Sequence, residues 1–349
     1  MSMSCDNGDE RDRPDGSVIS MSLDLVLCTS RSDWDRFVSG SPQGSIFCTT
    51  GFLDALEVEY DLWIVRESDR LQAGAIVLRK NQEVLRAPRP FALYQGVMFA
   101  GDEDGSAVHR RAKWALGITE AFLVGLAERY DRLSFCLHHS TGDLRGLQWF
   151  HYHQPELGKF RLDLFYTGLI DLAAYQDVDS YLGAIRTTRR YEYRKALREG
   201  MTVEVSTDVA TLDELHRRTF ERQGLDRGEE EGRLLRAITN AALSQGFGEM
   251  LVCRDEKGEA ASATLFLYDD RSGYYLFGAN DPAHRHSNSG TFLLVENLRR
   301  CQARGLKQVD VCGINSPDRG DFKTSFNAVP VPYFVATWDR PSRNSVNAA

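Results

Sequence analysis

The chain has 349 residues with 42% hydrophobic and 26% charged side chains, and a formal net charge of -8. A chain of this length can bury two hydrophobic cores of ordinary domain size, and its acidic balance argues against a protein that coats nucleic acid through a general basic excess. The longest apolar runs, such as residues 121–126 and 292–295, are far shorter than the roughly 20 residues that a membrane helix needs. We therefore expect no membrane span.

The two ends of the chain differ from its body in composition. Residues 1–20 and 340–349 are rich in Ser, Asn, Asp and Pro and poor in large apolar side chains, which predicts disordered tails. The first of them lacks the apolar run of roughly 7 to 15 residues that a secretory signal requires, so we expect a cytoplasmic protein. The cysteines are scattered and form no CxxC pair. We therefore predict reduced core residues, and neither a disulfide framework nor a zinc knuckle.

Hydrophobic periodicity predicts one order of elements in both halves of the chain. In the first half we predict helices at 32–39, 52–59, 108–130 and 143–150, and strands at 62–66, 73–79, 132–137 and 159–164. In the second half we predict helices at 186–200, 212–222, 233–243, 291–304 and 322–327, and strands at 249–253, 261–268, 274–277, 308–311 and 331–337. The shared order predicts an α+β fold of two domains, 21–170 and 171–339, each a mixed sheet flanked by helices. Neither G-x-G-x-x-G nor a P-loop motif occurs, so binding of a dinucleotide or of ATP through a P-loop is not indicated.

The segment 181–200 reverses the sign of the chain's charge, with six basic residues against two acidic ones. Arg186, Arg190 and Arg194 recur every four residues, so on a helix their attachment points stand about 6 Å apart along one side. We expect no compensating acidic residue on that side. An adjoining face that can dock on the body is formed by Ile185, Tyr193 and Ala196. The pattern fits an edge that binds phosphates, and it fits equally a solvated helix whose Arg stems cover apolar surface.

Four blocks of the sequence resemble the Fem-type and BioF2-like acyltransferases of the GNAT superfamily. The blocks read RRYEYRKALREGMTVEV, GYYLFGAND, SGTFLLVENLRRCQARGLKQVDVCGIN and DFKTSFNA. The resemblance covers residues 181–338 well and the first half by element order alone. It implies two tandem GNAT-like domains, and transfer of an acyl or aminoacyl group from a thioester or a tRNA ester to an amine.

The resemblance also implies a catalytic lysine. Lys323 matches the FK position of the family, and a cation placed there could stabilise the tetrahedral oxyanion that forms when an amine attacks a carbonyl, which is worth on the order of a hundredfold in rate. The alternative is a solvated lysine on a short amphipathic helix that begins just after Gly320, is capped by Asp321, and turns Phe322 and Phe326 into the core.

The general base is not identified by sequence. His216, Glu221 and Asp310 are possible by residue type, and no spacing places them together. The pairs 138–139, 151/153 and 284/286 are His pairs without the Cys or Glu-x-x-His frame of a metal site. We therefore expect no metal and no bound cofactor.

The donor is addressed by a turn before the helix at 291–304. Acetyl-CoA enzymes of the superfamily carry an Arg/Gln-x-x-Gly-x-Gly/Ala turn whose backbone N–H groups hold a pyrophosphate. Here the matching segment reads RHSNSGT, with Asn288 in place of the first glycine. Asn obstructs close phosphate approach more than Gly does, although it tolerates left-handed backbone angles. Arg285, Ser289 and Gly290 are the residues of this turn that we expect near donor phosphates, together with the arginines of 181–200.

These observations favour an N-acyltransferase that moves an aminoacyl group from aminoacyl-tRNA to an amine of a small molecule, a peptide or a cell-wall precursor. One alternative is an acyl-CoA-dependent N-acyltransferase, and another is a non-catalytic binding module on a degenerate GNAT fold. The acceptor, the acyl group and the oligomeric state are not specified by the sequence.

Overall fold

The computed structural model describes residues 23–68, 70–101, 107–222 and 224–342. The predicted N-terminal tail lies outside these residues, as does the C-terminal tail from residue 343 onward. Within the described part of the chain, no helix is both long enough and apolar enough to cross a membrane.

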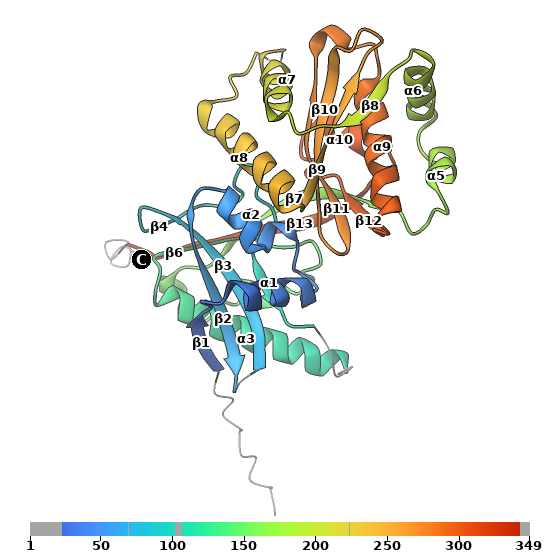
Figure 1. Cartoon of the computed structure of the whole chain (residues 1–349). Helices are drawn as coiled ribbons and strands as arrows, with labels where there is room; N and C mark the ends of the chain where they lie inside the picture. Colours follow the sequence, from blue (N-terminus) through green and yellow to red (C-terminus); the bar gives the residue numbers. More distant parts are fainter. Residues whose placement is uncertain (1–22, 69, 102–106, 223, 343–349) are drawn as a thin grey trace, which may run out of the picture.

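The first half of the chain, coloured blue to green in Figure 1, contains seven strands and five α-helices or short helical turns ahead of residue 158 and β7. In chain order these are β1 (Leu23–Leu27), α1 (Arg31–Gly40), η1 (Ile46–Cys48), α2 (Thr50–Ala55), β2 (Glu59–Glu67), β3 (Arg70–Lys80), β4 (Glu83–Val84), β5 (Val97–Phe99), α3 (Val108–Ala127), β6 (Arg132–Cys136), α4 (Arg145–Gln148), η2 (Pro155–Leu157) and β7 (Arg161–Asp171).

The second half, coloured green to red, continues with α5 (Val178–Ala184), α6 (Thr187–Arg198), β8 (Thr202–Val205), α7 (Val209–Arg222), α8 (Glu229–Gln245), β9 (Gly248–Arg254), β10 (Ala260–Tyr268), β11 (Ser272–Asn280), η3 (Pro282–His284), α9 (Ser289–Ala303), β12 (Gln308–Asp310), α10 (Pro317–Thr324) and β13 (Val329–Asp339). The predicted α+β class is confirmed.

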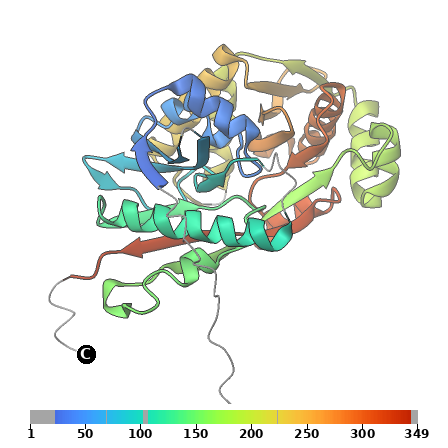
Figure 2. The same cartoon turned by 90° about the horizontal axis from the view of Figure 1, so that it is seen from below.

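Two sheets organise these strands. The first has the order β1-β2-β3-β4, with β5 also paired to β3, and the second has the order β6-β13-β7-β12-β11-β10-β9-β8. β13, the last strand, is antiparallel to both β6 and β7, and Figure 2 shows it running among first-half elements beside α3. The two halves are therefore joined by backbone hydrogen bonds. The predicted boundary at 170/171 stays a prediction, and β7 runs across it.

The sheet of the second half is covered on both faces because its central strands are apolar throughout. On β9, Met250 and Val252 pack in one core with α7 and α8, while Leu251 and Cys253 pack in another core with α9. This is the period-two alternation of a strand buried on both sides. Figure 1 shows α8 and α9 on opposite sides of these strands.

Several predicted bounds need correction. The helix predicted at 52–59 is α2, which ends at Ala55, and residue 59 already begins β2. The helix predicted at 322–327 is α10, which begins at Pro317 after the N-cap residue Ser316. Asp321 is therefore inside the helix and does not cap it. The prediction missed β1, β4, β5, α5 and β8.

The cysteines behave as predicted where the structure describes them. Cys48, Cys136, Cys253, Cys301 and Cys312 are buried free thiols, and Cys28 is partly buried. Cys5 lies outside the described residues.

Candidate active site

The strands β11 and β12 form a fork in the second sheet. They are the parallel pair of that sheet, and they pair over only three residues, from Ser272 opposite Gln308 to Tyr274 opposite Asp310. Beyond the fork, Val311 N–H donates to Gly168 O of β7, so the chain after β12 turns toward β7. The edge of β11 from Tyr275 onward consequently has no strand partner on this side.

A β-bulge reshapes β11 next to the fork. Leu265 pairs with Phe277 and the next residue, Phe266, pairs with Tyr275, so Leu276 is the extra residue. Because the bulge breaks the alternation, Phe277 packs in the core of α7 and α8, whereas Tyr275 stacks on Phe266 at 5.2 Å in the core of α9. Bulges commonly re-aim side chains beside active sites. Here the bulge presents both faces of the sheet to the fork.

Lys323 lies against the opposite wall of the fork. Its Nζ donates to Val311 O, Cys312 O and Gly313 O, the last at 3.2 Å, and stands 5.2 Å from the Tyr275 ring centroid. Burial lowers the pKa of this lysine to about 8, and Cys312 is the largest opposing influence.

This geometry overturns the reading of Lys323 as a solvated side chain. Its three hydrogen bonds hold the turn that follows β12, and to bind an oxyanion the ammonium would have to exchange one of them. The longest bond, to Gly313 O, is the one exchanged at least cost. The carbonyl-polarising role of Lys323 stays a prediction.

Asp310 is buried at the point of the fork. Its Oδ2 accepts from Tyr94 Oη at 2.5 Å, and its Oδ1 accepts from Thr167 Oγ1 and, at 2.8 Å, from Cys312 N–H. Burial and the neighbouring Asp310 carboxylate raise the pKa of Tyr94 well above its usual value. A carboxylate with three donors already bound is a structural anchor, so Asp310 is a poor general base.

His216 lies on the other side of the sheet, on α7. Its ring packs against Phe220, Phe277 and Phe91, with centroids 5.0, 5.9 and 6.2 Å away. Its Nδ1 is buried and has no hydrogen-bond partner. Burial, followed by Arg227, lowers the pKa of this histidine to about 4. His216 is therefore a neutral imidazole with a free nitrogen, which a proton acceptor requires, although so low a pKa makes it a weak base.

The third base proposed from residue type is not part of this group. Glu221 is exposed near the end of α7 and accepts from Arg217. Its ion pair belongs to the surface of the helix.

Arg319 is a residue that sequence reasoning missed. It lies one turn before Lys323 on α10, so the two side chains share a face of the helix. Its charge acts on Lys323, on Tyr275 and on His216, whose pKa values it lowers after the larger effect of burial. The i, i+4 spacing from the FK lysine was the available signal.

The arginines of 181–200 separate into different roles. Arg186 precedes α6 as its N-cap residue and pairs with Asp321 at 3.0 Å, which corrects the expectation that this side has no compensating acid. Arg190 donates to Gly183 O at 3.2 Å, and Arg194 is exposed on α6. The docking face is confirmed, because Ile185, Tyr193 and Ala196 are buried.

Arg189, which the sequence did not single out, fastens α6 to α10. Its guanidinium donates to Ser325 Oγ and to Glu192, both at 2.7 Å, and lies 4.7 Å from the Phe322 ring centroid. Phe326 is fully buried, as predicted.

The turn before α9 has the backbone that the sequence suggested. Asn288 takes a left-handed conformation with φ 61° and forms the N-cap of α9. Ser289 N–H is engaged by Ser287 Oγ at 3.3 Å, and the Thr291 hydroxyl donates to Glu192 at 2.7 Å. A carboxylate from α6 thus already occupies the first turn of α9.

The other two residues expected near donor phosphates also lie at this turn. A Cβ on Gly290 would come within 2.7 Å of Asn280 Oδ1, so only glycine fits without a shift. Arg285 is exposed just ahead of the turn.

One group of metal-ligating side chains stands out in the described part of the chain, at Asp255, Glu259 and His284. His284 Nε2 lies 3.2 Å from Asp255 Oδ2, which an ordinary hydrogen bond explains. The rings of His138 and His139 stack at 4.0 Å, and burial lowers the pKa of both. These observations give no reason to assign a metal.

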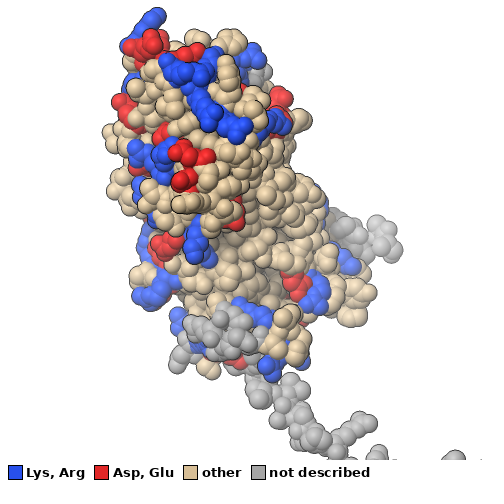
Figure 3. Space-filling model, turned by 90° about the vertical axis from the view of Figure 1, so that its right-hand side faces the viewer, with Lys and Arg blue, Asp and Glu red and all other residues tan. Residues whose placement is uncertain are grey.

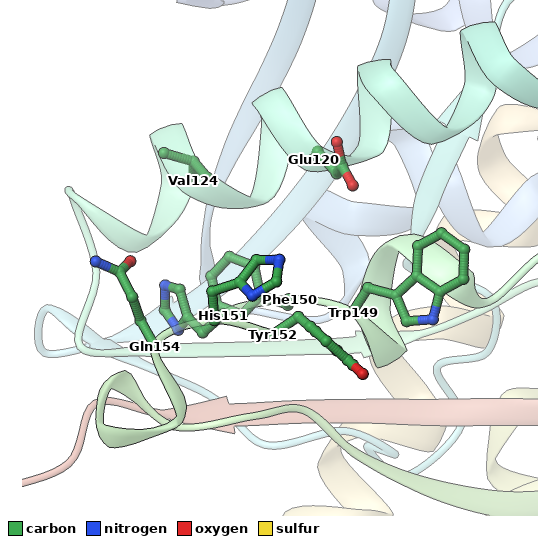
Figure 4. A pocket seen from close by; sticks show the side chains of 8 residues that line it. Glu120, Val124, Trp149, Phe150, His151, Tyr152 and Gln154 are labelled. Atoms are coloured by element: carbon green, nitrogen blue, oxygen red, sulfur yellow. The ribbon is translucent and has the colours of Figure 1, made fainter. Parts of the chain in front are cut away.

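A second hollow, of ≈ 660 Å³, lies under α3 in the first half. Figure 4 shows Glu120 and Val124 of α3 above it and the side chains of residues 149–154 below. None of the predicted site residues lines it.

Comparisons with known proteins agree with this architecture. Residues 183–324 match the model of an acetyltransferase (GNAT) domain family. Among solved structures, FemX has 15% identity and a TM-score of 0.65, over 89% of this chain and 96% of FemX. A tandem GNAT protein of the clavulanic acid biosynthesis pathway has 13% identity and a TM-score of 0.53, over 92% and 99%.

A C-terminal domain from Agrobacterium fabrum, named for lysylphosphatidylglycerol synthetase, has 14% identity and a TM-score of 0.52, over 91% of this chain and 95% of that domain. A comparison with curated proteins found no match. The GNAT match supports acyl transfer as the class of activity, and it implies an acyl donor and an amine acceptor. The chain is thus a Fem-type tandem GNAT-fold protein whose second half carries an acetyltransferase (GNAT) domain.

Proposed function

We propose that this protein is an N-acyltransferase that transfers an aminoacyl group from aminoacyl-tRNA to an amine. The new C–N bond forms as the amine attacks the ester carbonyl, and the C–O bond to the tRNA ribose breaks. The ribose hydroxyl leaves with one proton, and the amine loses another to solvent or to a neutral base such as His216.

The observation that carries the choice of donor is the carboxylate of Glu192 at the N-terminus of α9. A pyrophosphate of CoA would bind to the free N–H groups of such a turn. Here Glu192 accepts from Thr291 of that first turn, and Ser287 Oγ engages Ser289 N–H. A dianionic pyrophosphate would meet a fixed negative charge, so the turn is poorly suited to CoA.

The surface around α6 suits a longer anion. Arg190, Arg194 and Arg198 lie along α6, and no acidic side chain pairs with Arg190 or Arg194 among the described residues. Figure 3, which faces the side carrying α5 and α6, shows Lys and Arg atoms gathered across its upper part. A nucleic-acid backbone could follow these charges past the site, whereas one CoA could reach only part of them.

The fork supplies the chemical environment. The unpaired edge of β11 and the ammonium of Lys323 lie on its two walls, and both can donate hydrogen bonds to a carbonyl that develops negative charge. Preorganised donors in a water-poor site are typically worth a hundredfold or more in rate each.

The test is transfer to a panel of amines from charged tRNA, measured with and without RNase and over a range of salt concentrations. If tRNA is the donor, RNase abolishes transfer, and affinity falls steeply with salt because several phosphates are bound. The double variant Arg190→Gln/Arg194→Gln should reduce the salt slope, and Arg110→Gln on α3 serves as an exposed control. Transfer that persists unchanged after RNase treatment would refute the donor assignment.

The alternative donor is acyl-CoA. The clavulanic acid pathway protein with the same fold is described without AcCoA, and the left-handed Asn288 leaves the path of the turn compatible with a phosphate loop. Robust transfer from acyl-CoA with weak salt dependence would favour it.

A further inference from the structure

Arg319 has an unusual position among the arginines around the fork. On α7, Arg217 and Arg218 both pair with Glu214, and Arg227 pairs with Asp213 at 2.6 Å. Arg319 makes no hydrogen bond and no ion pair with any residue that the structure describes, and its side chain is exposed. A guanidinium left without a partner next to a candidate site is available to a ligand.

The direction of this side chain follows from α10. Arg319 and Lys323 are four residues apart on the helix, so they project on the same side. Lys323 reaches the turn after β12 and the ring of Tyr275. Arg319 therefore lies at the outer end of the same wall, one helical turn of about 5 Å nearer to solvent.

Arg319 also reaches the opposite face of the sheet. Its charge is felt by His216 on α7 as well as by Tyr275 and Lys323. The apolar rings of Phe91 and Phe277 lie next to His216. The guanidinium consequently stands where α7, β11 and α10 meet, beside an imidazole and two aromatic rings.

This place differs from the one expected for donor phosphates. The residues expected to hold the donor, Arg285, Ser289 and Gly290, are at the N-terminus of α9, on the face of the sheet that carries α6 and α9. His216 and Phe277 belong to the core of α7 and α8 on the other face. A ligand group bound by Arg319 therefore approaches from the side opposite to the donor.

We propose that Arg319 binds the carboxylate of the amine acceptor, which is therefore an amino acid or a peptide with a free carboxylate near the reacting amine. The proposal rests on the proposed function, because only an amide-forming enzyme needs such an acceptor at the fork. Arg suits this role, since its planar guanidinium can donate two parallel hydrogen bonds to one carboxylate. The neighbouring Phe91 and Phe277 would contact the apolar part of the acceptor.

The test measures binding without any donor, so that it does not depend on transfer. Amino acids and dipeptides, each as the free acid and as the carboxamide, are titrated into the full chain and observed by ligand NMR. The wild type should bind free acids roughly 10- to 100-fold more tightly than carboxamides, as expected of a hydrogen-bonded charge pair. Arg319→Gln should remove the preference, Arg319→Lys should keep part of it, and Arg110→Gln should not change it.

Other results would overturn the proposal. They are a preference that survives Arg319→Gln, an equal loss of both ligand forms in a folded variant, and failure of every free acid to bind the wild type. Displacement of the free acids by inorganic phosphate at lower concentration than by acetate would assign the site to a donor phosphate instead. Absence of transfer to any amine, with the carboxylate preference intact, would count against the proposed function alone.

Discussion

Replacing Lys323 with methionine separates the two roles that its position allows. Methionine keeps the length and apolar stem of the side chain and removes the ammonium. If this ammonium stabilises the oxyanion, the variant should lose roughly a hundredfold in kcat while staying folded. Because the lysine pKa is about 8, wild-type kcat should also decline as the pH rises through 8, and the variant should lack this decline.

The same substitution has a stability signature whose sign can be worked out. Burial lowers the pKa of Lys323 from 10.5 to about 8, so between these values the unfolded chain binds more protons than the folded chain. Stability therefore rises with pH over this interval, by about 3 kcal/mol, since each pKa unit corresponds to about 1.4 kcal/mol. Below pH 8 the burial cost is constant.

Two effects oppose each other at pH 7 in Lys323→Met. Three backbone carbonyls lose their donor, at about 1 to 3 kcal/mol for each one that water cannot reach, and the cost of burying the cation disappears. A net loss of no more than a few kcal/mol is expected, which leaves the variant folded for kinetics.

The assay combines denaturant unfolding at pH 7.5 and 10 with kcat measured from pH 6 to 9.5. The exposed Lys80→Met is the control. Wild-type kcat in a folded Lys323→Met protein would refute the oxyanion role. A stability difference between wild type and variant that does not change from pH 8 to 10 would refute the reasoning from burial.

Two further predictions follow from buried polar groups. The pKa of His216 is about 4 in the folded chain and near 6.5 when unfolded, so stability should fall by about 3 kcal/mol as the pH drops from 6.5 to 4; unfolding of His216→Phe should lack this component, and an identical acid dependence in both proteins would contradict it. Tyr94→Phe removes a donor from the buried Asp310 and should cost about 1 to 3 kcal/mol, read as a lower denaturant midpoint at unchanged slope; the exposed Tyr152→Phe should change it by less than about 0.5 kcal/mol, and equal effects would show that Asp310 needs no donor from Tyr94.

Sequence periodicity identified the long elements because their burial patterns are local. α3, α8, β3 and β10 have apolar residues at helical or strand spacing over most of their length, and each was predicted close to its observed bounds. The missed strands are very short or largely exposed, such as β4 with two residues and β8 with one partly buried residue. Short runs carry too few apolar positions to define a period.

The error at α10 had a signal in the sequence. Ser316 followed by Pro317 marks an N-cap and a first helical position, and starting the helix there places Arg319 and Lys323 on one face. The prediction took Gly320 as the boundary and lost this relation. The flanking residues of a motif thus decided what its lysine could be seen with.

The pairing of the site residues could not be predicted, because it depends on contacts far apart in the chain. Arg186 meets Asp321 across 135 residues, and Arg189 meets Ser325 across 136. The even spacing of the arginines described the helix correctly, while the partners that neutralise Arg186 come from α10. A charge ladder read from one segment therefore overstates the free charge that the fold leaves.

The fork itself is made by both halves of the chain. Asp310 on β12 is held by Thr167 from β7 and by Tyr94, which precedes β5 in the first half. β13 returns from the second half to pair with β6, so the first half cannot shift without moving the strands around Asp310. Since Lys323 is bonded to the turn that starts one residue later, a change in the loop that carries Tyr94 has a direct mechanical route to the fork. The first half is therefore part of the site, and substitutions at Tyr94 should alter acceptor selectivity as well as stability.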